Sequence, residues 1–186
     1  MKYIYISFII LFFSCNTTRK KFKVESEFID NYDVYAWFDK NNIWALSLPI
    51  SLNITNDNIK RQILYYQYNY KNSEKGKAIS LYEIKGNEKL DLVENFRKKE
   101  LNLNSKSTFL ILTKHIVIDN KLAEEITSNL NMSVQLNDSI SLGNFKKFKE
   151  KHEKMIKKLI RGDTLYLRFK ESKGKKKKRI KVPINL

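Results

Sequence analysis

The chain of 186 residues contains few of the side chains that most often bind metals or exchange protons at neutral pH: two histidines, His115 and His152, and one cysteine, Cys15. An unperturbed histidine can act as a base or hold a metal. His152, however, falls on an apolar helical stripe, where a histidine usually packs in the core. The usual structural zinc sites take four Cys or His ligands, and the chain has three in all. We therefore expect no metal and no cofactor.

Neighbouring carboxylates, the other common route to hydrolysis, lie among lysines in this chain. One pair is Glu124 with Glu125, and another is Glu150 with Glu153. Carboxylates three or four residues from lysines on a helix usually form solvated ion pairs. Phosphate-binding loops, the nucleophile elbow of hydrolases and the His-Glu-x-x-His zinc motif are absent from the sequence. The sequence favours a protein that is not an enzyme.

The first fifteen residues predict export. Lys2 is followed by an eleven-residue run from Tyr3 to Phe13 that is interrupted only by Ser7, and Ser14 and Cys15 come next. A basic start, a short apolar run and a small residue before the cleavage point are typical of a secretory signal peptide. The run is too short for a membrane-spanning helix, which needs about 20 apolar residues.

The four residues Phe12-Phe13-Ser14-Cys15 resemble the lipobox of bacterial lipoproteins, although phenylalanine is less common than aliphatic residues at the first two positions. In that family the cysteine sulfur receives a diacylglyceryl group, the preceding peptide is removed and the new amino terminus is often acylated. The resemblance implies a signal peptide over residues 1–14 and a lipidated Cys15. From the rest of the chain we expect a tether over residues 15–30 and a single β-rich domain over residues 31–186. Two or more acyl chains hold a protein stably on a membrane.

The same resemblance implies a location in the bacterial cell envelope. No acidic run follows Cys15 of the kind that directs some lipoproteins to the cell surface. We therefore expect the body to lie in the periplasm, held to a membrane by its lipid.

The positive charge is concentrated at the carboxyl-terminal end. The whole chain carries +16, and residues 145–186, with 17 Lys or Arg and four Asp or Glu, carry +13 of it. If a helix and a hairpin in this region pack together, their cations form one surface that attracts polyanions. The expected partners are the membrane, an envelope polyanion or a protein; nucleic acid is not expected, because exported lipoproteins seldom meet it. The predicted anion-binding residues are Lys146, Lys147, Lys154, Lys158, Lys175, Lys176, Lys177, Lys178 and Arg179.

Period-two alternation of apolar residues predicts most of the elements that position these side chains. Residues 44–54 alternate most clearly, and Pro49 within them predicts an edge strand or two strands meeting at a bend. Further strands are expected over 34–38, 62–70, 77–84, 90–93, 108–118 and 132–136, with a loop or short helix over 94–107. Helices are expected over 119–130 and 144–161, the second ending at Gly162. A hairpin with a basic turn around Gly174 closes the chain.

This order of elements predicts a mainly β or α+β fold: an antiparallel, sandwich-like sheet with two helices inserted in the carboxyl-terminal half. The resulting hypothesis is a membrane-anchored bacterial lipoprotein that is not an enzyme and has a basic carboxyl-terminal surface. Two alternatives stay open. One is an envelope hydrolase that uses carboxylates or His115. The other is an inhibitor or immunity-type protein that acts on another envelope protein.

Overall fold

The computed structural model describes residues 21–39, 42–71, 79–86, 89–117, 124, 139–171 and 177–186. Within these ranges the chain is mainly β. The strands are β1 (Lys23–Phe28), β2 (Asp33–Asp39), β3 (Asn42–Ser47), β4 (Pro49–Thr55), β5 (Arg61–Asn69), β6 (Ser80–Ile84), β7 (Leu90–Leu92), β8 (Lys99–Leu101), β9 (Lys106–Leu112), β10 (His115–Ile116), β11 (Ser139–Asn144), β12 (Thr164–Glu171) and β13 (Lys177–Pro183), and the helix is α3 (Phe145–Ile160).

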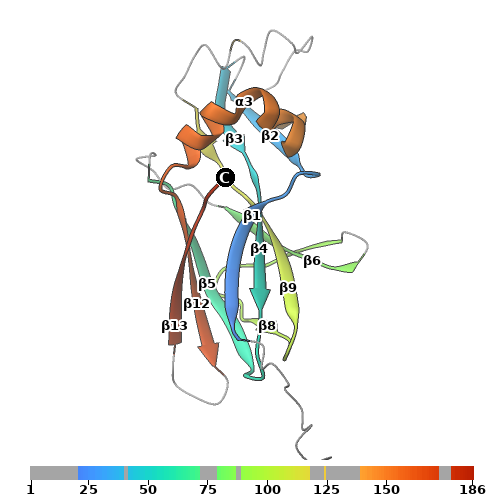
Figure 1. Ribbon diagram of the computed structural model, residues 1–186, viewed down its shortest axis with the longest axis vertical. Helices are drawn as coiled ribbons and strands as arrows, with labels where there is room; N and C mark the ends of the chain where they lie inside the picture. The colour runs from blue at the N-terminus through green and yellow to red at the C-terminus, as the bar shows by residue number, and fades with distance from the viewer. Residues whose placement is uncertain are drawn as a thin grey trace, which may run out of the picture.

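Two antiparallel sheets form a sandwich in the lower part of Figure 1. The first has the strand order β1-β4-β9-β6-β7, and the second has the order β13-β12-β5-β8. Alternate residues of both sheets meet in one apolar core. Its fully buried members include Ile50, Leu52, Phe109, Leu165 and Phe169. The predicted antiparallel, sandwich-like fold is confirmed in this part of the chain.

A third sheet and α3 form a cap at the other end of the molecule (Figure 1). The sheet has the order β10-β3-β2-β11, and the second apolar cluster lies between it and the helix. The helix begins after Asn144, whose side chain accepts a hydrogen bond from the backbone N–H of Lys147, and ends before Gly162 at φ +81°. The helix predicted over residues 144–161 is thus confirmed.

The chain passes from the sandwich to the cap by changing sheet at bends. Strands β3 and β4 belong to different sheets and meet at Leu48, so the second of the two interpretations of Pro49 is confirmed. Strands β9 and β10 meet in the same way at Thr113 and Lys114, and the continuous strand predicted over residues 108–118 is therefore wrong. At the crossing, the Thr113 hydroxyl accepts from the Leu48 N–H at 3.1 Å and donates to the Leu48 carbonyl at 3.2 Å.

Three other predictions need correction. The described residues contain one helix, so the prediction of two is not borne out; the helix expected over 119–130 and the strand over 132–136 lie outside the described residues, apart from Glu124. Residues 23–28 were expected in the tether but form β1, because Val24, Ser26 and Phe28 turn inward between exposed charged residues. Residues 99–101 were expected in a loop or short helix but pair with β5 as β8.

We predict that replacing Thr113 by valine destabilises the protein by about 1–3 kcal/mol, because the buried Leu48 N–H then loses its hydrogen-bond partner. Thr113→Ser keeps the hydroxyl and loses one buried methyl group, and it is expected to cost about 1 kcal/mol or less. Urea unfolding of the two variants measures the difference. A valine variant as stable as the serine variant would show that the crossing does not depend on this hydroxyl.

Candidate functional site

The lower end of the sandwich in Figure 1 brings together segments that are far apart in the sequence. Lys23 at the start of β1 pairs with Thr55, and Thr55 pairs with Lys106. Glu171 at the end of β12 pairs with Arg61 at the start of β5. We call this the tether end, because the described chain begins here, at residues that follow the predicted anchor.

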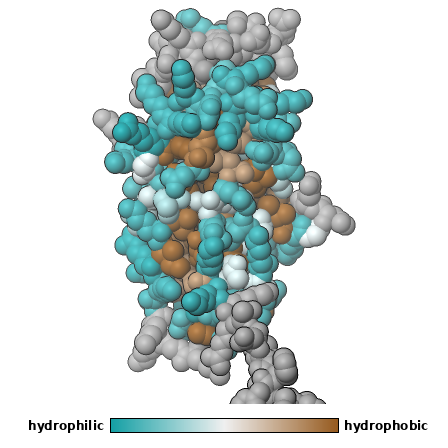
Figure 2. Space-filling model, in the orientation of Figure 1, coloured by the Kyte–Doolittle hydropathy of each residue, from teal (hydrophilic) through white to brown (hydrophobic). Residues whose placement is uncertain are grey.

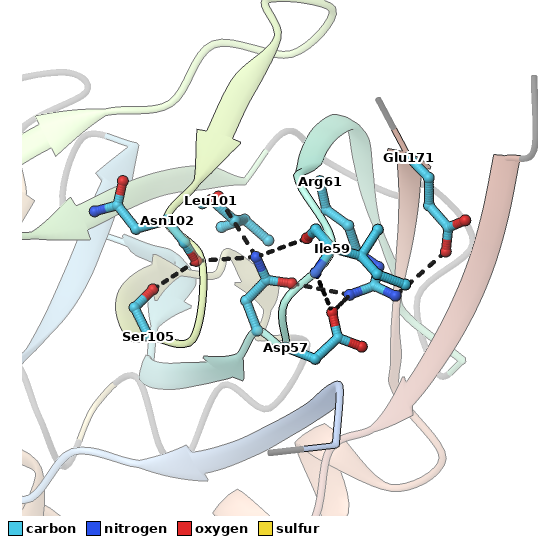
Figure 3. A network of polar contacts seen from close by, with 8 residues as sticks. Asp57, Ile59, Arg61, Leu101, Asn102, Ser105 and Glu171 are labelled. Carbon is cyan, nitrogen blue, oxygen red and sulfur yellow. Dashed lines mark hydrogen bonds and ion pairs between the residues drawn. The ribbon is translucent and has the colours of Figure 1, made fainter. Parts of the chain in front are cut away.

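A buried arginine joins the strands at the tether end (Figure 3). The Arg61 side chain is 5% exposed and forms ion pairs with Asp57 and, at 3.2 Å, with Glu171. It also donates to Oδ1 of Asn56, which holds the loop after β8 through the carbonyl of Asn102 at 2.9 Å. Partial burial opposes ionisation of Asp57, but hydrogen bonds from Arg61 and the Ile59 N–H hold the pKa of Asp57 below its ordinary value. The loops at this end are therefore held in one arrangement.

Phe22 fixes the point where the chain enters the body. Its ring lies edge-on to Phe169 at 5.1 Å, and the Arg61 guanidinium carbon lies 4.2 Å from the ring centre. The Lys178 ammonium lies 5.3 Å from the same ring. Neither Phe22 nor Arg61 was predicted as a functional residue from the sequence. One sequence feature could have indicated Phe22, because it is the only apolar residue between Asn16 and Lys23. A buried arginine has no comparable pattern.

The hairpin of β12 and β13 places like charges directly opposite each other. Lys170 pairs with Lys177, and Arg168 pairs with Arg179. Lys177, Lys178 and Arg179 are exposed. Arg179 also lies over the ring of Tyr166, at 4.6 Å from the ring centre. The predicted anion-binding residues Lys175 and Lys176 lie outside the described residues. The hairpin thus concentrates cations toward the tether end.

The predicted lysines of α3 lie at the opposite end of the molecule. Lys146, Lys147, Lys154 and Lys158 are exposed on the helix, and hydrophilic side chains cover this end in Figure 2. Strand β12 runs eight residues from the helix end to the tether end, about 25 Å. The described cations of the helix and those at the hairpin end, Lys177 and Lys178, are therefore not adjacent, but the exposed Arg179 and Lys181 lie between them along β13.

The first turn of α3 carries no acidic residue, although a helix start is stabilised by negative charge. Lys146 and Lys147 stand there instead. Of the predicted carboxylate pairs, Glu153 forms an ion pair with Lys157 at 2.7 Å, as expected for solvated pairing, and Glu150 is exposed. Glu125 lies outside the described residues. Glu150 and Glu153 are thus exposed surface charges on the helix.

His115 lies in the core at 2% exposure, between the cap and the sandwich. The rings of Tyr68 and Tyr70 stand edge-on to it, and its Nδ1 lies 3.6 Å from Oδ2 of Asp163. Burial lowers the pKa of His115 to about 3, so the ring is neutral at pH 7. Burial also raises the pKa of Asp163, although the Tyr68 hydroxyl and the Lys71 N–H donate hydrogen bonds to it. His115 is packed as part of the core.

His152 is half-buried on α3, where the helix is locally distorted (φ −124°, ψ 25°) and its ring contacts Phe148 at 4.7 Å. His152 therefore packs only partly against the core, where the sequence predicts a packed residue.

An open groove of about 370 Å³ lies beside the end of β1, away from both histidines. Its acidic groups are Glu27 and Asp30. The Asn53 amide donates to Glu27 at 2.6 Å and accepts from the Thr108 hydroxyl at 3.0 Å, so these polar groups of the floor satisfy one another. The groove is mixed in character, because Phe28, Ile29 and Ile84 line it beside these polar groups.

We predict that acid weakens the fold through His115. The folded ring has a pKa of about 3, against an ordinary 6.5, so between these values the unfolded chain takes up a proton that the folded chain does not. The neutral ring contributes fully to the free energy of unfolding above pH 6.5. This contribution falls as the pH is lowered toward 3, by about 2 kcal/mol between pH 7 and pH 5. Asp163, with its raised pKa, acts in the opposite direction over its own range.

Urea unfolding at pH 7 and pH 5 measures this loss. His115→Leu is expected to reduce it, whereas His152→Gln, at a half-buried position, is the matched control and is expected to retain it. An equal pH dependence in wild type and His115→Leu would contradict the assignment of a neutral, buried ring.

Among the described residues, no helix has the length and apolar character to cross a membrane. The same residues contain no group of three or more His, Cys, Asp or Glu side chains arranged to hold a metal ion. Comparisons of the chain with protein-family models, curated proteins and solved structures find no match.

Proposed function

We propose that the protein is a membrane-anchored lipoprotein of the bacterial envelope that acts by binding, with its body in the periplasm and its anchor at Cys15. The observation that carries the proposal is the order of signal-type residues, Ser14 and Cys15, followed by a chain that joins the body at Phe22. Phe22 is the seventh residue after Cys15, and a chain of seven residues reaches at most about 25 Å. A lipid at Cys15 would hold the tether end close to the membrane.

The packing of the described residues supports a binding role over catalysis. A hydrolase needs a general base that reaches substrate, and His115 is enclosed by Tyr68, Tyr70 and Asp163. The exposed cations of α3 offer instead a surface for an anionic partner, an envelope polyanion or an acidic face of a protein. Lysines in the first turn oppose the helix dipole, and a bound anion there would offset that cost. An inhibitor or immunity-type protein would use such a surface against its target.

We predict that expression of the whole chain in a bacterial host gives a protein that begins at residue 15 and carries a lipid-sized gain in mass. The protein is expected in the detergent phase on partitioning, because its acyl chains are apolar. Cys15→Ala is expected to lose both the mass gain and the lipoprotein-type cleavage. Ser14→Ala keeps a small residue before the cysteine and serves as the control.

An unmodified, cleaved product in both wild type and Cys15→Ala would contradict the anchor. The protein would then be a secreted body with a free thiol near its start. The binding surfaces would be tested unchanged in that case, because none of them includes Cys15.

We also predict that the double variant Lys146→Gln with Lys147→Gln weakens binding to lipopolysaccharide by about fivefold to thirtyfold, since each charge near an anionic surface contributes about 1 kcal/mol. The matched control, Lys85→Gln with Arg97→Gln, removes the same charge from side chains that are already paired with Asp91 and Glu94. Titration at low and high salt measures both. Equal weakening in the two double variants would mean that net charge, and not the α3 surface, governs binding.

A further inference from the structure

We propose that the tether end is a second binding surface, and that its partner is the anionic headgroups of the membrane that holds the anchor. The inference rests on the proposed anchor for the choice of membrane, but the surface itself is defined by residues of the folded body. In this arrangement the body docks end-on, and α3 is held away from the lipid toward the aqueous side.

Cations outnumber carboxylates among the described residues of the tether end. The nearby carboxylates are already paired: Glu25 with Lys23, Glu100 with Lys60, and both Asp57 and Glu171 with Arg61. Other cations at this end have no carboxylate partner among the described residues. They are Lys21, Lys106, Lys170, Lys177, Lys178 and Arg179. The end is therefore strongly positive, and an anionic membrane surface attracts such a group within about one Debye length.

The hairpin of β12 and β13 contains repulsion between like charges. Like charges directly opposite each other on neighbouring strands destabilise a sheet. The pairs Lys170–Lys177 and Arg168–Arg179 both have this arrangement, and the residues that face β12 from β5 on this side, Gln62 and Tyr65, are neutral. The described neighbours thus provide no compensating negative charge. A surface of phosphate groups would supply it, so docking relieves a repulsion that the fold alone retains.

Apolar side chains are also exposed at the tether end. Ile59 and Leu103 lie on the loops before β5 and after β8, and they are 37% and 53% exposed. Asn56 joins the two loops by donating to the carbonyls of Ile59 and Asn102. Two apolar side chains held among cations match the composition of surfaces that lie on membranes, where apolar groups enter the interface and cations meet headgroups. A soluble polyanion would use the cations alone.

The surface is also preorganised. The Arg61 network shown in Figure 3 holds both loops and the end of β12, and Phe22 packs against the same arginine. Little conformational freedom is left to lose on contact with lipid, which favours binding by a small number of charges. Phe22 and the docking surface are parts of one rigid end.

The test uses the lipid-anchored protein made from the whole chain and reconstituted on vesicles. The lipid occupies the sulfur of Cys15, so one introduced cysteine can be labelled alone. Asn58→Cys marks the tether end and Glu150→Cys marks α3, and both positions are exposed. Energy transfer from each label to an acceptor lipid reports its height above vesicles that contain either about one-third anionic lipid or only zwitterionic lipid.

Two matched triple variants locate the contact. Lys177→Gln, Lys178→Gln and Arg179→Gln remove three charges from the hairpin, and Lys146→Gln, Lys147→Gln and Lys154→Gln remove three from α3. On anionic vesicles we expect strong transfer from position 58, weak transfer from position 150, and loss of this difference in the hairpin variant or at 1 M salt. The α3 variant is expected to behave as wild type. The proposal is overturned if the difference in transfer between positions 58 and 150 is the same on anionic and zwitterionic vesicles. It is also overturned if both triple variants change that difference equally.

Failure of the anchor is distinguishable from failure of the docking surface. If intact mass shows no lipid, the unanchored protein is tested directly by sedimentation with the same two kinds of vesicles. The hairpin variant is then expected to bind anionic vesicles at least tenfold more weakly than wild type, up to on the order of a hundredfold. Binding that is unchanged in the hairpin variant overturns the surface, whether or not Cys15 carries a lipid.

Discussion

The crossing of two strand pairs at Leu48 and Thr113 is the constraint on which the rest of the structure depends. There β3–β4 and β9–β10 leave one sheet and join another, and the ladder of backbone bonds is interrupted inside the core. The hydroxyl of a fully buried threonine replaces the missing partner at this point. Because unsatisfied backbone groups are costly in a core, this single side chain lets one chain build both a sandwich and a cap.

The basic segment of the sequence reaches both ends of the protein. Residues 145–160 form a helix on the cap, and the chain then runs along β12 and turns back at the far end of the sandwich. The exposed Arg168, Arg179 and Lys181 lie between these ends on the hairpin. Charges that are more than a Debye length apart on this surface are largely screened by salt, so each end meets a partner mainly through its own cations.

Much of the fold was predictable from the sequence, and the reasons for the exceptions are physical. The alternation in 44–54, the stripe of α3 and Gly162 follow local rules and were correctly interpreted. Strand β1 was missed because charged residues occupy its exposed face, and the sheet change at Thr113 was missed because period two continues through it. The Arg61 network and the positions of the helix and hairpin cations in space depend on tertiary pairing. No local sequence pattern encodes that pairing.

Phe22 has a consequence for the strength of any contact at the tether end. It fixes the chain to the core only seven residues after Cys15, so a lipid at that cysteine would confine the hairpin to a thin layer above the bilayer. Confinement by a short linker corresponds to an effective concentration in the millimolar range. A headgroup contact too weak to measure between free partners would then be occupied for much of the time, and small changes in lipid charge would change the tilt of the body rather than its attachment.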